Sequence, residues 1–268
     1  MMRFFLLALL AIYSAAIVAQ SDSMQVRELK IATDIIDRSG YAGTIVVYRE
    51  GDEFYQAAYP ERANKALIPA STFKIVSAMV ALDTGVIKGA SSIVPWDGVT
   101  RSRTELNKDL DLTTAFRVSA VPHFQTLVRE IGPQTMQLYI DSFGYGNQDI
   151  SGGDDTFWLQ GNLKISPVEQ LKLLRRLYDD DLPVRPEVMS AVKEMMISEQ
   201  TDSYTVHSKT GLAVLENGHN VGWWVGWIVS GDECLFFASA LEADSPDADF
   251  IPTRLSVVRE LLETMGLL

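Results

Sequence analysis

The β-rich segments of this chain lie near both of its ends, with a long helical stretch between them. Residues 43–48 and 54–58 are rich in β-branched and aromatic side chains, and the turn residues at 50–53 predict a hairpin between them. Residues 206–209, 223–229 and 235–241 predict three more successive strands. Because an isolated hairpin is only marginally stable in water, we expect early and late strands to share one five-stranded antiparallel sheet.

Several segments outside the predicted strands have helical patterns. Residues 26–36 and 255–265 carry apolar side chains at helical spacing and predict one helix near each end. Residues 166–169 have the composition of a capping box with Pro at the first turn, which predicts the start of another helix. We expect an α+β fold (an α/β sandwich) in which terminal helices flank a sheet lobe, about 24–65 and 200–268. An all-helical lobe, about 66–199, is inserted, and the crevice between the lobes is the natural site.

The first 19 residues have the pattern of a secretory signal peptide. A short positive start at residues 1–3 precedes an apolar run at 4–18, and Ala16 and Ala19 suit cleavage. A retained membrane anchor is the alternative, although the run is shorter than the ~20 residues that span a bilayer. We expect export to the periplasm of a single domain, residues 20–268, without a stable membrane anchor.

Charge and cysteine content exclude several classes of function. The net charge of -12 argues against a nucleic-acid partner, and an anionic small substrate would need a local basic pocket. Cys234 is the only cysteine, so no intramolecular disulfide can form, and its apolar neighbours predict a buried side chain.

The sequence lacks the motifs of two other classes of hydrolase. His123, His207 and His219 lack zinc-ligand spacing, so we expect no metal site. No Gly-x-Ser-x-Gly elbow of a Ser-His-Asp hydrolase is present.

Ser71 and Lys74 have the spacing of a nucleophile and its base. Residues 71–74 open an apolar run that predicts a buried helix, and a lysine three residues after a serine lies on the same helix face. Ser190 and Lys193 have the same spacing, so the pattern alone is weak. Context separates the two pairs, because the run after Ser71 would bury Lys74 whereas Lys193 adjoins Glu194 and is expected to be solvated.

Two further motifs add candidate groups. Ser119 and Val121 form a Ser-x-Val triplet that could supply a second hydroxyl, but such triplets recur in the chain. The sequence Lys209-Thr210-Gly211 occurs once and ends a predicted strand. A strand edge can pair with an amide-like substrate, the two polar side chains can bind a carboxylate, and the glycine permits close approach. A simple strand-ending turn remains the alternative.

These motifs, taken together with Tyr145-Gly146-Asn147 and Trp158, occur in the order and intervals of class D β-lactamases (oxacillinases). The chain resembles this family over roughly residues 25–268. The resemblance implies the serine β-lactamase, or penicillin-recognising, fold and hydrolysis of β-lactam antibiotics. A structural role for Tyr145 stays open.

The resemblance also implies roles for individual residues. Ser71 is then the acylated nucleophile, and Lys74, once carboxylated by CO2 or bicarbonate, is the general base for acylation and deacylation. Burial supports this modification, since desolvation favours the neutral amine that attacks CO2. Trp158 would donate to the carbamate, and Ser119 would relay the proton to the ring nitrogen. The backbone N–H groups of Ser71 and Leu212 would form the oxyanion hole. The remaining implied groups bind substrate or keep the pocket dry: Val121, Leu159, Lys209, Thr210, Gly211 and Arg254.

Two relatives of such enzymes remain as alternatives. β-Lactam sensor domains share these motifs but stay acylated, and they follow several membrane spans, whereas this chain has only a signal-like run. Cell-wall transpeptidases share Ser-x-x-Lys and Lys-Thr-Gly but not the Trp158 region. We expect small-molecule β-lactam substrates, no bound cofactor apart from CO2, and no nucleic acid. The sequence leaves open whether the protein forms a homodimer and which β-lactam classes it prefers.

Overall fold

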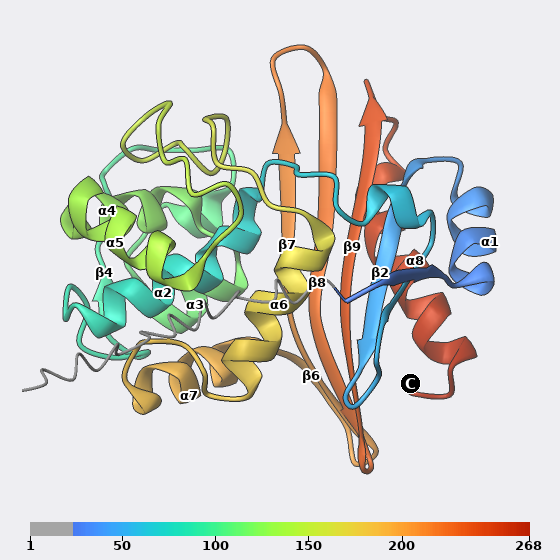
Figure 1. Ribbon diagram of the computed structural model, residues 1–268. Coiled ribbons are helices and arrows are strands. Elements are labelled where there is room, and N and C mark those ends of the chain that lie inside the picture. The colour runs from blue at the N-terminus through green and yellow to red at the C-terminus, as the bar shows by residue number, and fades with distance from the viewer. Residues whose placement is uncertain (1–23) are drawn as a thin grey trace, which may run out of the picture.

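The computed structural model describes residues 24–268, so the predicted signal peptide lies outside the described residues. A twisted sheet stands between two layers (Figure 1). Helices α1 (Lys30–Ser39) and α8 (Phe250–Thr264) lie on one side of the sheet, and a helical lobe lies on the other. No helix among the described residues is both long and apolar enough to cross a bilayer.

The main sheet joins the early and the late strands, as predicted. Its order is β1-β3-β2-β9-β8-β7-β6. The strands are β1 (Val26–Glu28), β2 (Ala42–Arg49), β3 (Tyr55–Ala57), β6 (Ile197–Gln200), β7 (Tyr204–Val214), β8 (His219–Ser230) and β9 (Glu233–Asp244). The junction is the antiparallel pairing of β2 with β9, in which Ala42 faces Glu242 and Arg49 faces Leu235. Strands β7, β8 and β9 form an antiparallel meander.

The predicted strand number was too low, because the sheet has seven strands rather than five. The additional strands, β1 and β6, are short edge strands. Residues 26–28 were expected to begin a helix, but they pair with β3, and α1 begins only at Lys30. This pairing is parallel, so the sheet is not wholly antiparallel. Strand β1 is stabilised by a partner distant in sequence, which local periodicity does not reveal, whereas β6 pairs with the adjacent β7.

The sheet separates two apolar cores. On the α1 and α8 side, Ile35 and Val258 pack with Trp224 and Phe237, which alternate with residues that point to the opposite face. On the other side, α6 (Pro167–Tyr178) packs on β9, β2 and β8 and connects the sheet to the helical lobe. One continuous buried core joins this face of the sheet to the lobe around α2, and the site described below lies where the lobe meets β7.

The helical lobe contains α2 to α7 and several short elements. Its helices besides α6 are α2 (Lys74–Asp83), α3 (Leu112–Arg117), α4 (Val121–Ile131), α5 (Pro133–Phe143) and α7 (Pro186–Met195). The short elements are the 3-10 turns η2 (Ala70–Phe73) and η3 (Thr104–Leu106), and the pair β4 (Ile93–Val94) and β5 (Leu110–Asp111). A further 3-10 turn, η1 (Pro60–Arg62), contacts β1 and β2 and belongs to the sheet lobe. The capping box is confirmed, because Ser166 and Glu169 bond reciprocally at the start of α6.

Candidate active site

Ser71 lies in a tight turn rather than in the first turn of an α-helix. The turn η2 precedes α2, and Ser71 is 8% exposed. Ala70 has φ 49°, a left-handed conformation that costs a non-glycine residue roughly 1–3 kcal/mol. The turn is held by neighbours, since Ala70 N donates to Trp158 O at 2.9 Å and Thr72 Oγ1 donates to Pro69 O at 2.7 Å. The surrounding structure therefore maintains a strained segment that carries the serine.

Lys74, the first residue of α2, is completely buried beside Ser71. Its Nζ lies 2.9 Å from Ser71 Oγ and 5.4 Å from the centre of the Phe124 ring. Burial lowers the pKa of the Lys74 amine well below its ordinary value, and the nearby charges of Lys209 and Arg103 lower it further. The neutral amine is thus favoured, and it lies within reach of the Ser71 proton.

Trp158 supplies a buried donor that has no protein acceptor. Its side chain is 1% exposed and stacks on Phe73, with ring centres 5.4 Å apart and planes at 28°. Within residues 24–268, its Nε1 has no hydrogen-bond partner. An unpaired buried N–H costs about 1–3 kcal/mol, so an anion bound there would be stabilised. The residues present therefore fit a carboxylated Lys74, which is a small anion in a dry pocket.

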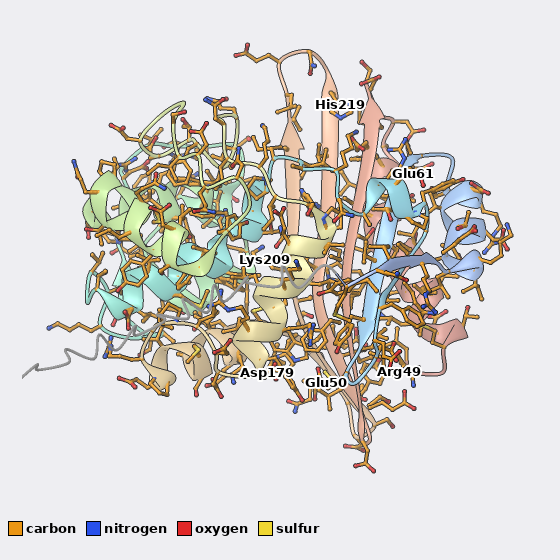
Figure 2. All side chains as sticks on the ribbon, in the orientation of Figure 1. Arg49, Glu50, Glu61, Asp179, Lys209 and His219 are labelled. Carbon is orange, nitrogen blue, oxygen red and sulfur yellow. The ribbon has the colours of Figure 1, made fainter. Side chains whose placement is uncertain are left out.

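Ser119 and Lys209 meet across the junction of the helical lobe and β7. Lys209 Nζ donates to Ser119 Oγ at 2.9 Å, and Figure 2 shows Lys209 at the boundary between the lobe and the sheet. Ser119 has φ 58°, a second left-handed residue at the site. Burial, followed by the charges of Arg254 and Arg103, lowers the pKa of Lys209 to about 7. The amine is therefore only partly charged near neutral pH.

The Lys209-Thr210-Gly211 motif lies within β7 rather than at its end as predicted, because pairing with β8 continues to Val214, and this part of β7 lies against the turn that carries Ser71. A side chain at Gly211 would place its Cβ 3.1 Å from Pro69 O and 3.2 Å from Thr72 Cγ2, so glycine permits this close packing. Arg254, from α8, donates from Nη1 to Gly211 O at 2.6 Å. Thr210 and Leu212 flank Gly211 and are half-buried. The geometry thus brings the Lys209-Thr210-Gly211 strand, Arg254 and the Ser71 turn together.

The remaining predicted residues occupy the helical side. Val121 is the first residue of α4, two residues after Ser119, and Leu159 directly follows Trp158. Both are half-buried. The Ser190 and Lys193 pair is different, because the Lys193 ammonium group donates its hydrogen bonds elsewhere, to Tyr178 O at 3.2 Å and to Asp180 Oδ1 at 2.8 Å.

Two features near the site were not predicted. Arg103 lies near enough to lower the pKa of both lysines, although no motif contains it. Gln170, fully buried on α6, donates from Nε2 to Thr72 Oγ1 at 2.8 Å and so braces the Ser71 turn from below. The sequence did contain a signal for Gln170, because it is a polar residue on an otherwise apolar face of its helix.

Tyr145 is buried beneath the site rather than lining its surface. It is 2% exposed and packs edge-on against Phe73, with ring centres 5.6 Å apart. Burial raises the pKa of its hydroxyl, while Thr72 and Gln170 act in the opposite direction. This placement favours the structural reading of Tyr145.

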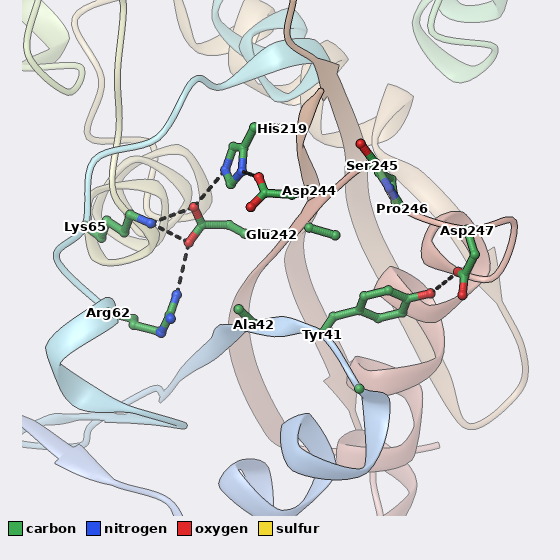
Figure 3. A pocket seen from close by; sticks show the side chains of 12 residues that line it. Tyr41, Ala42, Arg62, Lys65, His219, Glu242, Asp244, Ser245, Pro246 and Asp247 are labelled. Carbon is green, nitrogen blue, oxygen red and sulfur yellow. Dashed lines mark hydrogen bonds and ion pairs between the residues drawn. The ribbon is translucent and has the colours of Figure 1, made fainter. Parts of the chain in front are cut away.

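A separate cavity lies away from these residues. It measures about 580 Å³ and surrounds Glu242, which pairs with Arg62, Lys65 and His219 (Figure 3). A cavity of about 500 Å³ adjoins the site and is lined by Phe116, Lys209 and Thr210 among others. The cluster at Glu242 compensates the charge of a nearly buried carboxylate. Within the described chain, no group of side chains has the composition of a metal site.

Cys234 is buried, as its neighbours in the sequence predicted. Burial raises the pKa of its thiol to about 12, so little thiolate exists at neutral pH. This residue therefore packs as a small hydrophobic group.

Comparisons with known proteins agree with this geometry. The penicillin binding protein transpeptidase domain matches residues 41–263. Beta-lactamase OXA-10 of Pseudomonas aeruginosa is 43% identical over 209 residues, which cover 77% of this chain and 78% of that protein. Beta-lactamase OXA-48 of Klebsiella pneumoniae is 38% identical over 221 residues, 82% of each protein.

Solved structures of similar proteins are also β-lactamases. FUS-1 (OXA-85), a class D beta-lactamase from Fusobacterium nucleatum subsp. polymorphum, superposes with a TM-score of 0.86 at 36% identity. The match covers 90% of this chain and 100% of that one. The class D beta-lactamase YbXI from Nostoc superposes with a TM-score of 0.84 at 35% identity, covering 88% and 99% of the two chains. These relations confirm the resemblance seen in the motifs: the chain belongs to the class D β-lactamase family.

Proposed function

We propose that this protein hydrolyses β-lactam antibiotics through an acyl-enzyme on Ser71. The observation that carries the proposal is the buried Lys74 amine, 2.9 Å from the Ser71 hydroxyl and depressed in pKa. A neutral amine in a dry pocket can react with CO2, and the carboxylated lysine would supply an anionic oxygen as general base. Trp158 Nε1 would donate to that oxygen, and CO2 or bicarbonate is the only added requirement.

The first half-reaction transfers the lactam acyl group to the enzyme. Ser71 Oγ loses its proton toward Lys74 and bonds to the lactam carbonyl carbon, while the backbone N–H groups of Ser71 and Leu212 stabilise the oxyanion. The carbon–nitrogen bond breaks, and the proton taken up at Lys74 passes through Ser119 to the departing ring nitrogen, so that Ser119 regains the proton it gives. Lys209 supports this proton transfer, because its Nζ donates a hydrogen bond to Ser119 Oγ.

The second half-reaction releases the product. Water, activated from the Lys74 side, attacks the ester carbon; the bond to Ser71 Oγ breaks and the serine regains its proton. Val121 and Leu159 limit solvent to that water. Thr210, Lys209 and Arg254 hold the substrate carboxylate, and Gly211 lets the substrate approach the strand. Basic groups are thereby concentrated at one place in a protein of net charge -12.

The test uses the purified protein and a chromogenic cephalosporin. We expect many turnovers per enzyme molecule, faster turnover with added bicarbonate, and no turnover by Ser71→Ala. A burst of one equivalent without further turnover would instead indicate a β-lactam sensor. Acyl transfer to an added peptide amine in place of water would indicate a transpeptidase. Export to the periplasm is part of the proposal and rests on the sequence of residues 1–19.

A further inference from the structure

A cationic side chain from the loop before η3 lies beside the reaction site. Arg103 Nη2 donates to Val118 O at 2.9 Å, and the next residue, Ser119, accepts from Lys209. The charge of Arg103 acts on both buried lysines, whose pKa values it lowers. Arg103 is therefore part of the electrostatic environment of the site, even though it belongs to no motif.

The loop that presents Arg103 is held by its own polar contacts. Arg101 donates from both terminal nitrogens to the Asp97 carboxylate, at 2.8 and 2.6 Å. Asn107 accepts from Arg101 N and donates to Arg101 O, each at 2.9 Å. A loop fixed in this way loses little further conformational freedom when a ligand binds, so a charge that it presents can contribute to affinity.

The Arg103 guanidinium retains donors for a ligand. Its Nε pairs with Glu105 at 2.8 Å, and the two side chains are 51% and 48% exposed. An ion pair this exposed is weak and is easily replaced. Within residues 24–268, Nη1 has no protein partner. The planar guanidinium suits a carboxylate, which it can bind through two nitrogens.

Arg103 and Arg254 approach the site from different lobes. Arg254 bonds to Gly211 O on β7, which belongs to the sheet. Arg103 bonds to Val118 O, which follows α3 in the helical lobe. Two guanidinium groups, one held by the sheet and one held by the helical lobe, therefore lie near Lys209, where the lobes meet.

We propose that Arg103 forms a second anion-binding contact of this site, so that β-lactams with an additional carboxylate are preferred over those with the ring carboxylate alone. This inference rests on the proposed function and names the substrate class that the site favours. The contact acts on selectivity, because a charge of one sign at the rim attracts the more anionic substrate.

The test compares benzylpenicillin with carbenicillin, which differ by one carboxylate on the acyl side chain. We expect Arg103→Gln to lower kcat/KM for carbenicillin by about threefold to fivefold more than for benzylpenicillin, as suits a half-exposed ion pair. Arg103→Lys should keep most of the preference. In the unmodified enzyme, the carbenicillin preference should decrease as salt rises from 50 to 500 mM, because exposed charges are screened.

The matched control is Lys108→Gln, which removes the same charge from a nearby exposed position. Lys108 is not among the residues that lower the pKa of Lys74 or Lys209, so the ratio of the two kcat/KM values should not change. An unchanged ratio in Arg103→Gln would overturn the inference. Hydrolysis of neither penicillin by the unmodified enzyme would instead overturn the proposed function, so the two failures are distinguishable.

Discussion

Replacing Trp158 by phenylalanine tests the central chemistry of the site most directly. The substitution keeps an aromatic ring beside Phe73 but removes the indole N–H, which is buried and without a protein acceptor in the described chain. A hydrogen bond to a charged group contributes about 1.5–3 kcal/mol. At about 1.4 kcal/mol per tenfold change, the loss corresponds to roughly 10-fold to 100-fold weaker retention of CO2 on Lys74.

The assay is turnover of a chromogenic cephalosporin over a series of bicarbonate concentrations. We expect half-maximal activity of Trp158→Phe to require roughly 10-fold to 100-fold more bicarbonate, by the same hydrogen-bond argument. The rate of acyl release should fall more than the rate of acylation. Trp158→Ala should show the same order of effects but also unfold more easily, because truncating a buried tryptophan costs about 3–5 kcal/mol.

A matched control distinguishes the N–H from the loss of ring volume. Trp223 is also fully buried, but its Nε1 already donates to Ile68 O at 2.8 Å. Trp223→Phe should therefore lower the melting temperature without changing the bicarbonate requirement. If Trp158→Phe shows the bicarbonate dependence and acyl-release rate of the unmodified enzyme, the donor role of Trp158 is wrong.

Two further measurements follow from the structure. Burial lowers the pKa of Lys209 to about 7, so the free enzyme loses this positive charge as pH rises through that value. We expect kcat/KM for benzylpenicillin to fall in this range more steeply than for its methyl ester, which lacks the carboxylate; parallel profiles would contradict the role of Lys209. Separately, Gly226→Ala should lower the free energy of unfolding by ~3 kcal/mol or more, because its Cβ would lie 2.1 Å from His207 O. Gly89→Ala, with no neighbour closer than 4.0 Å, should have little effect in the same urea titration, and equal losses would refute the steric reason.

Several parts of the site could be predicted because they depend on residues close together in the chain. The capping box at Ser166 and Glu169 is a contact between neighbours, and it formed as expected. The Ser71 and Lys74 pair likewise needs only one turn of helix and an apolar continuation that excludes water. The apolar, β-rich runs at residues 223–229 and 235–241 indicated strands for the same reason, and both strands are buried along nearly their whole length.

Other features were decided by contacts between distant segments. Strand β1 exists because residues 26–28 meet β3, and that partner outweighed a local helical pattern. Arg103 reaches the site only because its loop folds back onto Val118. The unpaired donor of Trp158 and the brace from Gln170 to Thr72 are likewise visible only once α6, η2 and the Trp158 segment are packed together.

The sequence by itself therefore indicated the types of the longer elements, the pairing of Ser71 with Lys74 and the family motifs, because neighbouring residues specify these through spacing and hydrophobic pattern. The tertiary structure alone decided the number of edge strands, the unpaired donor of Trp158, and the cations that lower the pKa of Lys74 and Lys209. The physical reason is that desolvation and electrostatic coupling depend on what surrounds a group in space, and those surroundings come from segments far apart along the chain.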